Sequence, residues 1–297
     1  MTTLPYWLVL GASASPTPSR DIEAARAALA SGCTGVWVGE SYVEGAPARL
    51  AALAAVVPDL RLGFGLVPVT SRGSDHLEET LSTISLLAPG RASLVFSLPT
   101  TLSPLARPGW EDRLAEAAAL ARRAGVPASA AVHDVETARL AAPHVDRLVL
   151  RGVDAEAVTR LRADLVGESS PAVDVWLDVA AADAVDGLAA VVAERLAVPG
   201  VPGHDAGRAV ARRRGFGGLL GEVEQAYALG LPERAARAVP EDLVRSTCLV
   251  VDDLPARLAE YRGAGADGVG LAVHDYDPET VLPLVRAAVG GDCPRGP

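Results

Sequence analysis

The sequence predicts a parallel α/β fold, a (β/α)8 barrel, from three observations. Short apolar runs without strict alternation return along the chain, which is typical of strands buried on both faces. Helical segments separate these runs, so that strand and helix alternate. Eight runs can be counted, and the Gly-rich first turn of the alternative, an open doubly wound sheet, is absent. Functional side chains are therefore expected at the C-terminal ends of the strands.

The elements follow in order along the chain. Ser19 and Ser74 are predicted N-caps, and Gly32 and Gly125 are predicted helix stops. The strands are expected at 6–11, 36–39, 62–67, 92–97, 129–132, 147–150, 173–177 and 268–273. The helices are expected at 19–30, 48–57, 74–87, 110–124, 135–142, 154–165 and 278–289.

A long connection, 179–267, separates the last two strands. Helices are expected in it at 182–196, 219–229 and 254–264. The Gly/Pro/Arg stretch 199–218 is its part most expected to be mobile. We interpret 1–297 as a single barrel domain with this connection as an insertion, either a lid or a packing element.

Composition narrows the class of protein. The 297 residues are 49% apolar and carry a net charge of −10, which argues against nucleic acid as a partner. The only basic run, 212–214, is interpreted as a solvated helix face. The three cysteines have no metal-ligand spacing, and neither a signal peptide nor an apolar run of ~20 residues is found. A soluble, cytoplasmic protein without a metal is expected.

Four motifs carry a family resemblance. They are GCTGVWVGE at 32–40, RLGFGLVPVTSR at 61–72, LLAPGR at 86–91, and VPEDLV at 239–244 followed by 254–273. In this order they resemble the bacterial luciferase-like family, which includes flavin-dependent monooxygenases and deazaflavin (coenzyme F420)-dependent oxidoreductases. The C-terminal segment is more similar to the deazaflavin branch. The resemblance implies a barrel, F420 or FMN as cofactor, a small organic substrate, and a homodimer formed by helices on one side of the barrel. The alanine-rich helix 50–57 either packs on such a partner or only covers the barrel.

Three positions depart from the family pattern. Ser41 stands where the family usually has a His beside the reactive ring. The turn SLPTT at 97–101 lacks the Gly that lets backbone approach the cofactor. VHDVE at 132–136 replaces a Gly-Pro turn that cradles phosphate, and its two acids would repel a phosphate. Either the cofactor binds differently here, or this member has lost it.

The strand ends supply the candidate site, and each residue has a structural alternative. Glu40 is a base or a helix cap, Arg72 is an anion contact or an ion-pair partner, and Asp134 is a helix N-cap in its alternative interpretation. The resemblance places the turn at 70–72 behind the cofactor ring, near an unusual cis peptide. The predicted catalytic residues are Glu40, His133 and His274, the cofactor contacts Val67, Thr70, Arg72, Ser97 and Asp134, and the substrate contacts Ser41, Arg151 and Asp178.

Three functions are consistent with these residues. The first is an F420- or FMN-dependent oxidoreductase in which the cofactor carries the hydride and His133 or His274 donates the proton; secondary metabolism is one setting for it. The second is a cofactor-free member that uses acid/base chemistry for a cyclisation, elimination or isomerisation of a natural-product intermediate. The third is a non-catalytic binding or assembly subunit.

Overall fold

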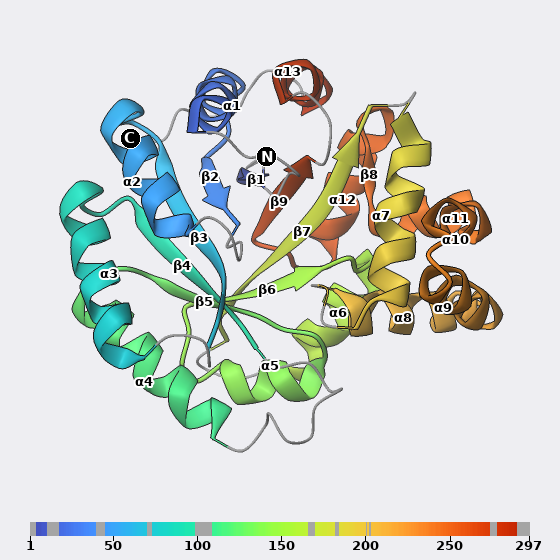
Figure 1. The fold of residues 1–297 in the computed structure, drawn as a ribbon, viewed down its shortest axis with the longest axis horizontal. Helices are drawn as coiled ribbons and strands as arrows, with labels where there is room; N and C mark the ends of the chain where they lie inside the picture. Colours follow the sequence, from blue (N-terminus) through green and yellow to red (C-terminus); the bar gives the residue numbers. More distant parts are fainter. Residues whose placement is uncertain are drawn as a thin grey trace.

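A closed barrel of parallel strands forms the centre of the molecule, with helices around it (Figure 1). In the computed structural model the described residues are 4–10, 18–39, 45–69, 73–98, 109–165, 170–181, 184–199, 201, 203–273 and 278–289. The barrel strands are β1 Tyr6–Leu10, β2 Gly35–Val38, β3 Arg61–Pro68, β4 Ala92–Ser97, β5 Ala128–Ala131, β6 Arg147–Arg151, β7 Ala172–Ala180 and β9 Gly268–Val273. Each pairs in parallel with the next, and β9 pairs with both β7 and β1, which closes the barrel. The predicted (β/α)8 fold is therefore confirmed.

The barrel helices follow the strands as the alternation of elements predicts. They are α1 Pro18–Ala30, α2 Ala46–Val56, α3 Ser74–Leu87, α4 Trp110–Arg123, α5 Val135–Ala141, α6 Ala155–Asp164 and α13 Pro278–Val289. Their buried faces join the outward-facing strand residues in one main core. In α2, for example, Leu50 and Leu53 are buried in this core while Val56 is exposed. One face of this helix therefore covers the barrel. None of the helices that the structure describes is long and apolar enough to cross a membrane.

The insertion between β7 and β9 is a helical bundle with a core of its own (Figure 1). It comprises α7 Val185–Ala197, α8 His204–Arg213, the 3-10 turn Gly217–Leu219, α9 Leu220–Ala228, α10 Pro232–Ala238 and α11 Glu241–Thr247. The connection then continues through the short strand β8 Leu249–Val250, the 3-10 turn Val251–Asp253 and α12 Leu254–Gly263. The buried residues of α12 belong to the main core around the barrel. The strand β8 pairs in parallel with the C-terminal end of β7, where Val179 lies opposite Leu249. The described part of 199–218, expected to be mobile, contains α8, which the sequence did not predict because Gly and Pro flank it. The helices α10 and α11 were also missed.

The barrel interior is filled by tryptophans that lie over glycines. Trp7, Trp37 and Trp176 face inward, and Trp37 lies 5.6 Å from Trp7 and 5.5 Å from Trp176 between ring centroids. Each ring covers a glycine on the neighbouring strand. A Cβ atom at Gly63 would lie 2.0 Å from the ring of Trp37, a separation that real atoms do not adopt. Corresponding contacts pair Trp7 with Gly35 and Trp176 with Gly270. Glycine inside a strand usually lowers the stability of that strand. Here the missing side chains provide the space in which three indoles fit inside one barrel.

Candidate functional site at the barrel mouth

Two ion pairs face the barrel interior, one at each end of β6 and β7. Side chains on a strand alternate between faces, so residues four apart share a face. Arg147 Nη1 lies 2.5 Å from Asp174 Oδ1 at the N-terminal end of the barrel. Arg151 Nη2 lies 3.3 Å from Asp178 Oδ1 at the C-terminal end. The second pair therefore lies at the mouth, where barrels carry their chemistry.

The insertion contributes a second guanidinium to Asp178. Arg195, on α7, ion-pairs closely with Asp178 Oδ2, and both side chains are buried, with 2% and 0% of their area exposed. Burial lowers the pKa of Arg195, but the ion pair with Asp178 outweighs burial and raises the pKa above its ordinary value. Burial in turn raises the pKa of the Cys248 thiol to about 11, so that the thiol stays protonated at neutral pH. Asp178 lies at the mouth beside a buried arginine, and its predicted contact with a substrate stays a prediction.

Arg195 occupies space that a missing side chain provides. Gly152, directly after β6, has a φ of +65°, and a Cβ there would lie 2.7 Å from Cδ and Nη1 of Arg195. The imidazole Nδ1 of His204 lies 2.8 Å from the carbonyl oxygen of Arg195. The Arg195 side chain is thus enclosed between the β6 turn and α8, and it joins the insertion to the barrel.

The turn after β6 is covered by the insertion as well. Asp154 caps α6 by accepting a hydrogen bond from the N–H of Ala157 at 3.1 Å, and it ion-pairs with Arg213 and with Arg214 (3.0 Å to Nε). Burial would raise the pKa of Asp154, but the hydrogen bonds from both arginines outweigh it and lower the pKa. Part of the predicted solvated basic run is therefore engaged in packing. These contacts favour the packing interpretation of the insertion over the lid.

His133 and Asp134 follow β5 and have different surroundings. His133 is buried, and its Nε2 lies 3.1 Å from the carbonyl oxygen of Leu98, just after β4. Because a carbonyl only accepts, this contact requires a proton on Nε2. Asp134 is the N-cap of α5 and forms a capping box with Thr137, whose N–H donates to Asp134 Oδ1 at 2.7 Å. The structural alternative for Asp134 is thus observed, while its contact with a cofactor stays a prediction.

The capping box yields a test of Asp134. Replacing Asp134 with Ala is expected to lower the free energy of unfolding by ~1 kcal/mol, because α5 loses its cap. Asp134→Ser keeps a capping oxygen and is expected to fold with nearly wild-type stability. Urea unfolding measures both variants. A loss of ligand binding in the well-folded Ser variant would instead assign Asp134 to the binding site.

The remaining predicted residues lie on two faces of the barrel strands or outside the described residues. Ser97 has the same parity on β4 as the interior residue Val95 and so faces inward. Val67 belongs to the outer core and faces the helices. The residues Glu40, Ser41, Thr70, Arg72 and His274 lie outside the described residues. The cis peptide that the resemblance implies lies at Gly65–Leu66, within β3.

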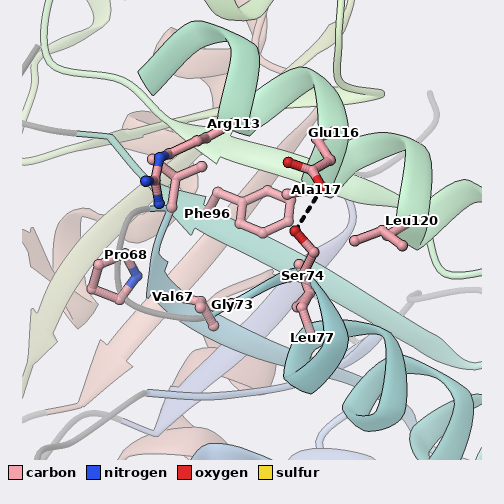
Figure 2. Close-up of a pocket in the computed structure, with 11 residues that line it drawn as sticks. Val67, Pro68, Gly73, Ser74, Leu77, Phe96, Arg113, Glu116, Ala117 and Leu120 are labelled. Carbon is pink, nitrogen blue, oxygen red and sulfur yellow. Dashed lines mark hydrogen bonds between the residues drawn. The ribbon is translucent and has the colours of Figure 1, made fainter. Parts of the chain in front are cut away.

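Val67 lines a pocket of about 240 Å³ outside the barrel, between α3 and α4 (Figure 2). Phe96 and Leu120 are among its apolar lining residues, and Arg113 of α4 is among its polar ones. Ser74 closes another side by donating a hydrogen bond to Glu116 at 2.6 Å. Because the strands β3 and β4 separate this pocket from the barrel interior, it is not part of the mouth.

Comparison with known proteins agrees with this architecture. No protein family model and no curated protein sequence matches the chain. Among solved structures, the coenzyme F420-dependent tetrahydromethanopterin reductase from Methanopyrus kandleri is similar with a TM-score of 0.77 at 14% identity, over 96% of this chain and 98% of that one. An F420-dependent secondary alcohol dehydrogenase, described in complex with an F420-acetone adduct, is similar with a TM-score of 0.67 at 14% identity (96% and 99% covered).

A flavin protein shows the same likeness. The FMN-bound oxygenating constituent of the 3,6-diketocamphane monooxygenase of Pseudomonas putida is similar with a TM-score of 0.61 at 15% identity, over 98% of this chain and 99% of that one. The likeness extends over nearly the full length of each protein, so it includes the insertion as well as the barrel. The chain therefore has the barrel fold of the luciferase-like monooxygenases and F420-dependent reductases, as the motifs in its sequence predict.

Proposed function

We propose that the protein is an oxidoreductase of the luciferase-like type, which acts on a small organic substrate at the barrel mouth with F420 or FMN as redox partner. The observation that carries this proposal is the near full-length likeness, insertion included, to a reductase and a dehydrogenase named for F420 and to an FMN-bound monooxygenase. Fold likeness at this sequence identity does not identify the cofactor. The question is therefore whether the residues at the mouth fit the phosphate of a flavin or deazaflavin.

Two of the described turns at the mouth, after β5 and β6, do not fit a cofactor phosphate. A phosphate at the start of α5 needs free backbone N–H groups. Here the N–H groups of His133 and Asp134 both donate to the Thr137 hydroxyl at 3.2 Å, and the N–H of Thr137 donates to Asp134. The start of α6 is likewise capped by the carboxylate of Asp154. We therefore derive no catalytic step through a bound flavin.

This disagreement favours a cofactor that is exchanged with solution. Without phosphate contacts at these turns, a flavin or deazaflavin is expected to bind with a Kd of tens of micromolar, roughly −6 to −7 kcal/mol. Such a molecule acts as a co-substrate and is lost during purification. The mouth then has to bind and orient two small molecules rather than one.

A second candidate, cofactor-free acid/base chemistry, is favoured by the same closed turns. Its proton donor in the described part of the mouth is His133, whose Nε2 proton is held on the Leu98 carbonyl. That contact leaves Nδ1 as the nitrogen that exchanges a proton with a ligand. Both candidates therefore assign His133 the same task, and they differ in whether a redox partner is needed.

Titration with FMN and with F420, each oxidised and reduced, separates the two candidates. Binding followed by fluorescence in the tens of micromolar range, with oxidation of the reduced form when a substrate is added, supports the proposal. A protein that remains yellow through purification would contradict the exchangeable cofactor. No binding of any form would overturn the redox function and favour the cofactor-free candidate.

His133 is expected to be needed for turnover. Replacing it with Asn keeps a hydrogen-bonding side chain but removes the titratable ring, so the expected loss in kcat is about 10²- to 10⁴-fold with little change in stability. His144→Asn is the matched control, because His144 lies in the turn between α5 and β6, on the opposite side of the barrel from the mouth. Equal activity of the two variants would exclude His133 as the proton donor.

A further inference from the structure

The pocket between α3 and α4 lies outside the barrel and has an apolar floor. The floor is formed by side chains that are almost completely buried, Val67, Leu77, Phe96 and Leu120. Side chains alternate along a strand, so Phe96 faces this pocket while its neighbour Ser97 faces the barrel interior. At about 240 Å³ the pocket is smaller than the ~300–1,000 Å³ that drug-sized ligands occupy. It therefore fits a small molecule with a short apolar part, and it is too small for a flavin.

Two opposite charges on α4 line this pocket without pairing with each other (Figure 2). Arg113 and Glu116 are three residues apart, the spacing at which Arg257 and Glu260 on α12 do form an ion pair. Within the described part of the chain, no hydrogen bond or ion pair engages the Arg113 guanidinium. Glu116 accepts a hydrogen bond on Oε1 from Ser74, and no group among the described residues donates to its Oε2. The pocket thus has a cation and an anion that can each accept a further partner.

These charges are complementary to a small zwitterion. A guanidinium binds a carboxylate through its planar fork of N–H donors, and a carboxylate accepts charge-assisted hydrogen bonds from an ammonium group. A simple carboxylic acid would satisfy Arg113 but would bring a like charge close to Glu116, and a simple amine would meet Arg113 in the same way. An α-amino acid carries both groups on one carbon atom, and its side chain can cover the apolar floor. The charge pattern therefore favours an amino acid over an acid or an amine with the same side chain.

We propose that the pocket between α3 and α4 binds a small apolar α-amino acid, with Arg113 holding its carboxylate, Glu116 its ammonium group, and Phe96 and Leu120 its side chain. This site is separate from the barrel mouth and needs neither the cofactor nor the substrate of the proposed oxidoreductase. Both charged side chains are exposed to solvent, so each contact is weakened by water and salt. The affinity is therefore expected to be modest, with a Kd of about 1 mM.

Leucine and two analogues with the same side chain test the class of ligand. The analogue 4-methylpentanoate lacks the ammonium group, and 3-methylbutylamine lacks the carboxylate. In an NMR titration at low salt, we expect leucine to bind at least ~5-fold more tightly than either analogue, with a preference that shrinks as salt is added. No binding of leucine at ~10 mM, which would fill most of a site with a Kd of about 1 mM, would overturn the proposal. Equal binding of all three molecules would also overturn it.

Charge-neutral variants test which group holds which end of the ligand. Arg113→Gln should weaken the binding of leucine about 5-fold without weakening that of 3-methylbutylamine, which has no carboxylate. Glu116→Gln keeps an oxygen for Ser74 and should weaken leucine by a similar factor without weakening 4-methylpentanoate. Arg123→Gln is the matched control, because Arg123 is exposed in the last turn of the same helix and does not line the pocket. Unchanged leucine binding in both pocket variants, or an equal loss in all three, would overturn the assigned site.

Discussion

Replacing Asp178 with Asn is expected to lower the free energy of unfolding by about 3–5 kcal/mol, because two guanidiniums lose the carboxylate that they share and Arg195 has no access to water. Urea unfolding at neutral pH measures the change. A loss below ~1 kcal/mol would show that the Asp178 cluster is not required for docking of the insertion.

Asp174, at the other end of β7, is the matched control. Its partner Arg147 is 39% exposed and remains hydrated when the carboxylate is removed, so Asp174→Asn is expected to change the free energy of unfolding by about 1 kcal/mol or less. Burial raises the pKa of Asp174 above its ordinary 3.8, more than Arg147 lowers it, with a further rise from Asp267.

A raised pKa means that the folded protein prefers the protonated acid. The stability that Asp174 contributes is therefore complete below pH ~3.8 and is lost as the pH rises through its folded-state pKa. Asp174→Asn removes this loss, so the stability of the variant relative to the wild type should increase with pH across that window. A relative stability that falls with pH would show that the ion pair with Arg147 dominates instead.

Replacing Gly63 with Ala is expected to cost about 3 kcal/mol, because its Cβ would overlap the Trp37 ring, which is buried and cannot move aside. Thermal or urea unfolding measures the loss. Gly221→Ala is the control, since a Cβ at this helical position meets no atom within 4 Å. Combining Gly63→Ala with Trp37→Leu should cost less than the sum of the two single changes, because the smaller side chain leaves room for the methyl group. Strict additivity would contradict the assigned contact.

Periodicity and turn residues predicted the barrel well, because each strand is a buried apolar run with a helix after it. The cap at Asp134 was also predictable, since an acid directly before a helical segment is a local signal. The helices of the insertion were harder to predict. The helix α8 has Gly and Pro in the residues before it and Gly after it, and the short helices α10 and α11 begin next to prolines, so local propensity indicates loops where tertiary packing makes helices.

The role of Asp178 was not predictable for a different reason. Its place at a strand end is visible in the sequence, and so is the arginine seventeen residues later. What the sequence does not show is that α7 turns back so that Arg195 reaches the carboxylate, because this depends on how the bundle packs against the β6 turn. The pairing of each tryptophan with a glycine is hidden for the same reason: the residues meet only once the strand register is known.

The tryptophan stack makes closure of the barrel visible by spectroscopy. Three of the four tryptophans come from β1, β2 and β7, and their indoles couple only when these strands surround the same interior. The fourth, Trp110, lies on α4 outside the barrel. Near-ultraviolet circular dichroism from the coupled indoles thus reports the assembled interior, and its loss during unfolding marks the separation of β7 from β1 and β2, independently of whether the outer helices persist.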